Sequence, residues 1–215
     1  QYLKKLGQDL PVGIDYLFYR LAASSLPQSA DAISSLNAMG LEVSTLDVPD
    51  AKYDRALVSR FYDYHDWANE RILAMCDTVD VASLDKDYAI SSGTIRSTLL
   101  HLLSVETWWV SNWTESGQSF PQPSPGTSIA EIRESFTSVA ADRDAFVESV
   151  DAERAMQVIT VQPQAPPTSF RIGETITQVL LHGTHHRAQI INMLKRSGGQ
   201  IDNIDLLYWP ELSTA

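Results

Sequence analysis

Three of the five histidines lie close together in the chain, at positions 182, 185 and 186. On a helix, residues four positions apart lie one above the other, so the imidazoles of His182 and His186 can share one metal ion. His185 lies about 100° round the helix from His186 and cannot easily join them. A third ligand must come from elsewhere in the chain. We predict that it is His101, which stands in the apolar run 99–103, where a histidine is otherwise out of place.

A metal-free bundle whose histidines are hydrogen-bonded core residues is the alternative, because a lone histidine in an apolar helix more often has that role. The pair at four-residue spacing and the third histidine on another helix favour a metal, since imidazoles packed face to face without an ion would lose hydrogen bonds on burial. Three histidines leave one coordination position open, as catalytic sites do. A neutral set of this kind suits zinc, nickel, iron, cobalt or manganese, and we expect one such divalent ion as the cofactor.

The helix face that carries His182 also carries Gln178 and Glu174, at four-residue steps. Glu174 could act as a catalytic base or support a ligand, or it could simply favour the positive end of the helix dipole near the helix start. Residue 183 is Gly, where zinc-protease helices carry a general-base glutamate, so that peptidase mechanism lacks its base.

Three further residues are candidates for contact with a substrate. Trp67 and Trp108 fall on helix faces that carry ligands or lie one turn from them, and we expect them to line a cavity at the open site together with Gln178. Arg187 could clamp a substrate carboxylate or pair with an acidic neighbour such as Asp205, and of the two we favour the pairing.

Four segments have the three- and four-residue apolar spacing of amphipathic helices, over roughly 53–79, 94–116, 128–150 and 172–197. Ser91 and Ser92 are possible caps of the second segment, a capping box opens the third at Ser128, and Gly198 stops the fourth. Four such helices predict an all-α, antiparallel four-helix bundle, whose core is a common place to hold a metal. Residues 156–161 could form a short strand or an extended loop.

Residues 1–50 differ from the rest of the chain. We expect two short helices there, at 16–23 and 30–39, and assign the region no role: it could pack on the bundle, cover its mouth or contribute to a homodimer. The chain is therefore divided into an N-terminal extension, 1–50, and a metal-binding bundle, 51–215.

The composition disfavours several classes of protein. The chain has 215 residues, a formal net charge of -11 and a pI of about 4.7, and such an acidic chain repels nucleic acids and anionic membranes. No run approaches the ~18 apolar residues that a membrane span needs. The single cysteine, Cys76, gives no disulfide framework and looks like a small apolar filler rather than a nucleophile. We expect a soluble, cytoplasmic protein that acts on a small molecule.

Parts of the sequence resemble the DinB family of four-helix metalloproteins, which includes the bacterial YfiT-like thiol transferases. The first matching stretch resembles the family's Tyr-Asn-x-Trp-Ala-Asn segment, and the third is similar to its His-x-x-His-His-Arg-Gly-Gln signature. The chain departs from these at His65, where the family usually has Asn, and at Ala188, which replaces Gly. The four matching stretches are 64–71, 93–109, 182–189 and 205–209.

The resemblance implies that His101, His182 and His186 are the metal ligands, in agreement with helix geometry. It also implies an enzyme that transfers a low-molecular-weight thiol to an electrophilic small molecule, with the metal lowering the pKa of the thiol and binding the thiolate. A metal-dependent hydrolase that uses a metal-bound water is one alternative. A non-catalytic ligand-binding or stress-response module, in which the metal only stabilises the bundle, is the other.

Overall fold

The computed structural model describes residues 53–116, 126–161 and 167–212. These belong to a compact unit that spans Tyr53–Ala215. The helices expected at 16–23 and 30–39 lie outside the described residues, and the division of the chain at residue 50 stays a prediction.

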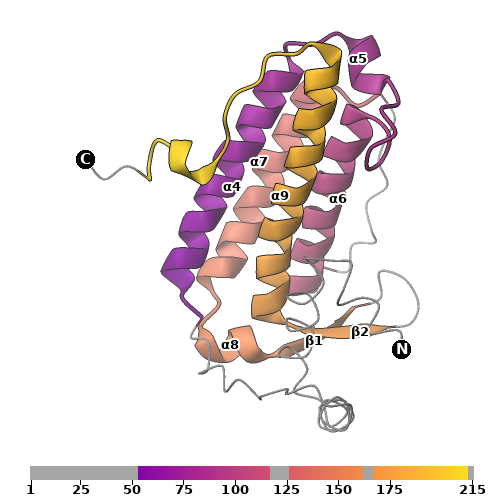
Figure 1. The fold of residues 1–215 in the computed structure, drawn as a ribbon. Coiled ribbons are helices and arrows are strands. Elements are labelled where there is room, and N and C mark those ends of the chain that lie inside the picture. Colours follow the sequence, from indigo (N-terminus) through magenta and orange to yellow (C-terminus); the bar gives the residue numbers. More distant parts are fainter. Residues whose placement is uncertain (1–52, 117–125, 162–166, 213–215) are drawn as a thin grey trace, which may run out of the picture. The chain divides into compact units, whose positions relative to one another are not determined.

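Four long helices make up the bundle, each packed against two of the others (Figure 1). Helices α4 and α6 both contact α7 and α9, so the four form a ring around one core. The predicted all-α bundle is confirmed, and each predicted helix end lies within three residues of the observed one. The helices are α4 (Arg55–Cys76), α6 (Ile95–Trp113), α7 (Ile129–Glu148) and α9 (Ile172–Ser197).

Two helices run in each direction along the bundle. Arg96, near the start of α6, donates to the carbonyl of Thr127, just before α7, so α6 and α7 begin at the same end. Arg55, at the start of α4, donates to the carbonyl of Glu148, at the end of α7, so these two helices are antiparallel. The pair α6 and α9, which carries the histidines, is also antiparallel (Figure 1).

Side chains and one glycine set the helix ends. Thr94 accepts the backbone N–H of Ser97 and so caps α6, a role that the sequence suggested for Ser91 or Ser92. The capping box predicted at the start of α7 is confirmed. Helix α9 ends at Gly198, whose φ of 78° lies in the left-handed region that glycine adopts without strain.

A small β-hairpin closes one end of the bundle, beside the short helix α8 (Ala152–Met156) (Figure 1). Its strands are β1 (Val158–Val161) and β2 (Thr168–Arg171), paired antiparallel. Of residues 156–161, which the sequence left as strand or loop, 158–161 form a strand, while Met156 ends α8. Strand β2 leads directly into α9, so the hairpin fixes where that helix begins.

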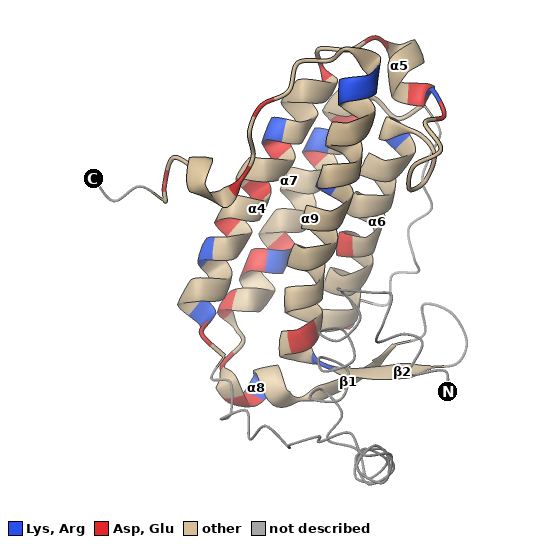
Figure 2. Cartoon of the chain, in the orientation of Figure 1, with Lys and Arg blue, Asp and Glu red and all other residues tan. Residues whose placement is uncertain are grey.

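Most of the core is apolar, but several histidine, glutamate and arginine side chains are buried within it. His65, Glu106, Arg143 and Arg187 are each no more than 2% exposed. Such residues are rarely buried unless they are paired, so their contacts carry information about function. Elsewhere acidic and basic residues are interspersed along the helices (Figure 2). None of the described helices is long and apolar enough to span a membrane.

Candidate metal centre

The three histidines expected from the sequence meet between α6 and α9. The Nε2 atoms of His182 and His186 are 3.0 Å apart. The ring of His101 lies across from both, with centroid distances of 5.2 Å to His182 and 4.7 Å to His186. One ring nitrogen from each residue lies within 4.8 Å of the others. This cluster could therefore hold one metal ion, since two histidine nitrogens on one zinc ion are about 3–3.5 Å apart.

Hydrogen bonds orient the ring of His186 and determine which of its nitrogens carries the proton. Its Nδ1 lies 2.7 Å from Oε1 of Gln189, and a carbonyl oxygen only accepts, so Nδ1 carries the proton and Nε2 keeps its lone pair. Metal-binding histidines are commonly oriented in this way by a partner on their second nitrogen. The Gln189 amide nitrogen lies 2.9 Å from Nε2 of His185. His185 is exposed and stands outside the cluster.

Burial keeps the cluster neutral. It lowers the pKa of His101 and of His186. The pKa of His182 falls to about 3, first because of burial and then because of the neighbouring histidines, while Glu106 opposes the change. Neutral imidazoles offer the lone pairs that a cation needs. The donor set therefore fits a divalent transition metal.

The cluster is only partly buried. His186 is 8% exposed, and His101 and His182 are half-buried. Within the described part of the chain, no fourth histidine, cysteine or carboxylate joins the group. Three protein ligands with an accessible remaining position are typical of catalytic rather than structural zinc sites.

The loop between α5 (Val81–Asp85) and α6 lies against the centre, which the sequence did not indicate. The hydroxyl of Ser91 is 3.2 Å from Nδ1 of His186. Ser91 and Ala89 have φ values of 52° and 57°, a left-handed conformation that is uncommon for residues other than glycine. Strained backbone of this kind is often found at functional sites. Here it holds the Ser91 hydroxyl over a candidate ligand.

A buried polar chain runs beside the centre, across the interior of the bundle. Nη1 of Arg187 lies 3.2 Å from Nδ1 of His65, and Nε2 of the same ring lies 3.3 Å from Glu106. Arg143 donates to Glu106 at 2.7 Å and to the Asp66 carboxylate at 2.6 Å. Because arginine only donates, Nδ1 of His65 accepts and its Nε2–H donates to Glu106.

This buried chain of polar side chains keeps the Glu106 carboxyl ionised. Burial raises the pKa of this carboxyl, but the hydrogen bonds from His65 and Arg143 and the positive charge of Arg143 outweigh burial and bring it to about 2. Burial lowers the pKa of His65, so its ring stays neutral between the two charged partners. None of these roles was anticipated from the sequence, where His65 was notable only as a departure from the family's Asn.

Gly183 allows the polar chain and the histidines to lie side by side. A Cβ atom at this position would lie 2.5 Å from Cε1 of His65 and 2.9 Å from Nη1 of Arg187. Such distances are not tolerated without a shift of the neighbours, so glycine is required by this close approach. The space next to His182 is occupied by the buried His65 ring, and a glutamate could not stand there.

The other expected site residues make contacts of their own in the structure, and their roles in the site stay predictions. The Glu174 carboxylate accepts the N–H of Arg171 at 3.1 Å, about 12 Å along the helix from His182 at 1.5 Å per residue. There it caps α9, and a role as base stays a prediction. Gln178 is exposed. Trp67 contacts Tyr64 with ring centroids 5.9 Å apart, and Trp108 is buried against Trp109. Their contact with a substrate is untested.

Arg187 differs from the favoured expectation. It does not pair with Asp205, and among the described residues no carboxylate lies within ion-pair distance of it; its bonded neighbours are Asn69, His65 and Thr184. Cys76 is fully buried and its thiol pKa is raised to about 12, first by burial, in keeping with an apolar filler.

Comparison with known families agrees with this geometry. The model of the DinB family matches residues 50–213, more than three quarters of the chain. The chain belongs to the DinB family. A search of curated proteins found no match. Family membership and the converging histidines together describe a DinB-family bundle with a histidine cluster that could bind a metal.

Proposed function

We propose that this DinB-family chain is a metal-dependent transferase that joins a low-molecular-weight thiol to an electrophilic small molecule. The observation that supports it most is the centre itself: three neutral imidazoles converge on one point, and no fourth ligand atom is contributed by the described residues. In this proposal His101, His182 and His186 hold the ion.

A divalent ion bound there would supply the positive charge that favours the thiolate, which is the reactive form of a thiol. The residues of the chain do the rest. The Gln189 amide and the Ser91 hydroxyl orient His186. In the transfer, the thiol sulfur bonds to the electrophilic carbon, the leaving group departs with the electrons of the broken bond, and the thiol proton is released.

The surroundings of Gly183 favour transfer over hydrolysis. A hydrolase needs a group near the metal to take a proton from water, and zinc-protease helices carry a glutamate beside the first ligand. Here His65 fills that space and is itself held neutral by burial. A thiol is far more acidic than water and needs less help to lose its proton.

The test uses the full, untagged chain. Elemental analysis should find about one transition-metal ion per chain, in keeping with a single histidine site. An alkyl halide or epoxide is then incubated with a panel of thiols, and with water alone, before and after removal of the metal by a chelator. We expect metal-dependent consumption of thiol. Product formed equally without thiol would indicate a hydrolase, metal without turnover would indicate a non-catalytic module, and metal-free protein would indicate core histidines. The homodimer, the stress-response role and the cytoplasmic location stay predictions.

A further inference from the structure

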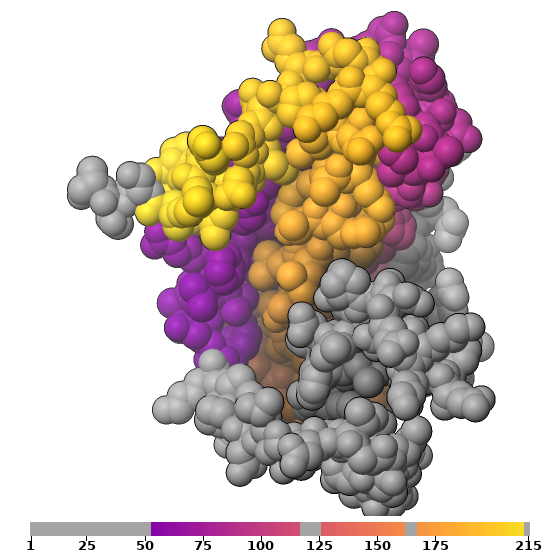
Figure 3. Space-filling model, in the orientation of Figure 1, coloured from indigo at the N-terminus to yellow at the C-terminus, as the bar shows by residue number. Residues whose placement is uncertain are grey.

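A cavity lies on the other flank of α9 from the histidines. Its volume is about 760 Å³, within the range of small-molecule sites. It is bounded by Tyr64 of α4, by α9 and by residues 201–206 of the segment that follows α9. Figure 3 shows this segment lying across α4 beside α9. None of the three histidines and no residue of α6 lines the cavity. On α9, its wall residues Thr184 and Ile191 lie about half a turn round the helix from His182.

Arg187 reaches this cavity and is the feature that indicates a ligand. Three arginines of the described chain are at least 95% buried: Arg96, Arg143 and Arg187. Arg96 bonds Asp85, and Arg143 bonds three acids, Asp66, Glu106 and Asp144. Arg187 has only neutral partners among the residues that the structure describes. Glu106 and Asp66 act on the Arg187 charge only from beyond ion-pair distance, and a buried cation without a direct counter-ion is unfavourable.

The guanidinium of Arg187 also has hydrogen-bond capacity left. Of its five N–H groups, two on Nη1 bond Asn69 and His65, and one on Nη2 bonds Thr184. Within the described chain, Nε–H and the second N–H of Nη2 have no partner. Nε and Nη2 share one edge of the guanidinium, which is an edge that binds a carboxylate through two parallel hydrogen bonds.

The rest of the cavity suits an anion with an apolar body. Lys195 stands on the same wall and forms no ion pair with any described residue. Of the two acids of the lining, Asp202 pairs with Arg71, whereas Asp205 accepts the N–H of Leu207 and keeps its charge, so the two cations Arg187 and Lys195 face one unpaired carboxylate. The remaining surface is largely aliphatic, with Ile191, Ile201, Ile204 and Leu206. The hydroxyl of Tyr64 donates to the Ile204 carbonyl at 2.7 Å and so holds the segment over the cavity.

We propose that this cavity binds a small organic carboxylate, separately from the metal centre. The carboxylate pairs with Arg187 and Lys195, and the apolar part of the ligand lies against the isoleucines. The proposal does not depend on the proposed transferase activity, because none of its residues is a metal ligand.

The test measures binding to the full, metal-loaded chain by calorimetry and by thermal shift. The probes are hexanoate, hexanol, hexylammonium and inorganic phosphate at matched ionic strength. We expect hexanoate to bind and raise the melting temperature, and the other three to bind much more weakly. Equal binding of hexanol would show an apolar site without charge recognition, and equal binding of phosphate would show that the apolar wall plays no part. No binding of hexanoate up to millimolar concentration would overturn the proposal.

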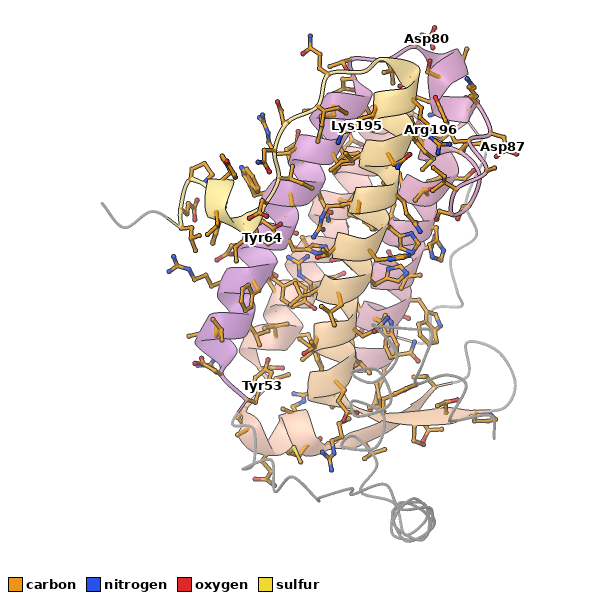
Figure 4. All side chains as sticks on the ribbon, viewed as in Figure 1. Tyr53, Tyr64, Asp80, Asp87, Lys195 and Arg196 are labelled. Carbon is orange, nitrogen blue, oxygen red and sulfur yellow. The ribbon has the colours of Figure 1, made fainter. Side chains whose placement is uncertain are left out.

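A matched pair of variants locates the site. Lys195→Gln and Arg196→Gln each remove one positive charge from the last turn of α9, but only Lys195 lines the cavity. Figure 4 shows Lys195 on the α4 side of the helix and Arg196 on the α5 side. Lys195→Gln should weaken hexanoate binding about two- to fivefold, as expected for an exposed pair, and Arg196→Gln should leave it unchanged. Equal weakening of hexanoate binding in both variants would mean that only the net charge of the protein matters, and it would contradict the assigned site.

Arg187→Gln should weaken hexanoate binding by at least about tenfold, since it removes a buried charged partner. If this variant does not fold, the comparison of Lys195 with Arg196 decides the question alone. Metal content is measured in every variant. A loss of metal in Lys195→Gln would show that the two sites are not separate.

Discussion

Two polar clusters lie inside the same apolar bundle, and they differ in how completely their groups are partnered. In the chain from Arg187 to Arg143, the Glu106 carboxylate is bonded on both oxygens, and His65 is bonded on both nitrogens. In the histidine cluster, the nitrogens that face one another have no acid among the described residues to pair with. The hydrogen bonds of the first cluster are made among its own side chains, whereas the ring nitrogens of the second could also bind an ion.

Polar groups whose hydrogen bonds are all made within the protein hold the fold, whereas polar groups with bonding capacity left are available for chemistry. A buried charge whose bonds are all satisfied stabilises one arrangement of the helices and offers nothing to a ligand. The ring nitrogens of the half-exposed histidines are the opposite case, because their lone pairs can bind a ligand. By the same criterion Arg187 is intermediate, since its hydrogen bonds are partly filled while its charge is not paired.

The largest expected effect is on the closed cluster. Arg143→Met leaves Glu106 buried and ionised with one partner fewer, and loss of one member of a buried pair costs about 3–5 kcal/mol of folding free energy. Denaturant unfolding monitored by circular dichroism measures this. Arg133→Met is the control: its pairs with Glu70 and Asp77 lie on the surface, and it should cost less than about 1 kcal/mol. Metal stoichiometry should not change in either variant, and loss of metal in folded Arg143→Met would show that the clusters are coupled.

Acid should weaken the same cluster. The pKa of Glu106 is about 2 in the folded chain, against an ordinary value of 4.5. Because the folded-state pKa is the lower one, the contribution of Glu106 is fully present above pH 4.5 and is lost as the pH falls toward 2, by roughly 3 kcal/mol in total. Unfolding free energies at several pH values in this window measure it. Glu106→Gln should flatten that part of the profile, and an unchanged slope would show that other carboxyls dominate acid unfolding.

Removal of a histidine should break the open cluster without a comparable loss of stability. His186→Ala takes away one of three ligands and should reduce metal affinity by at least about 100-fold, because even a partner of a ligand is worth 10–100-fold. His185→Ala, one residue away and exposed, should keep the metal. Titration with a competing chelator measures both. Equal loss of metal in the two variants would show that the ligand has been assigned to the wrong ring.

The open cluster could be predicted from the sequence because its key relation is local. His182 and His186 are four residues apart on a helix whose apolar spacing is unambiguous, and helix geometry alone places them on one face. The four helices follow from the same spacing. The prediction of His101 as the third ligand needed only the assumption that a polar residue in an apolar run has a buried partner.

The closed cluster could not be predicted in this way. Arg143 bonds Glu106 and Asp66, which precede it by 37 and 77 residues, and nothing in the local pattern selects these acids from the 27 in the chain. The pairing of Arg187 with Asp205 was wrong for the same reason, since proximity of charges in sequence does not give their direction in space. The approach of His65 to Gly183 depends on the packing of α4 against α9, which only the assembled bundle defines.

The smallest expected effect concerns Glu174, which belongs to neither cluster. Its carboxylate accepts the N–H of Arg171 at the start of α9, so Glu174→Gln should weaken this cap and lower stability by about 0.5–1 kcal/mol. Metal content should stay the same, because the carboxylate is about two turns of helix from His182. The rate of thiol transfer decides its role. An unchanged rate with slightly lower stability would assign Glu174 to the helix start alone. A slower rate with full metal and unchanged stability would establish the base that the sequence suggested, and would require the substrate to extend from the histidines along α9 toward the hairpin.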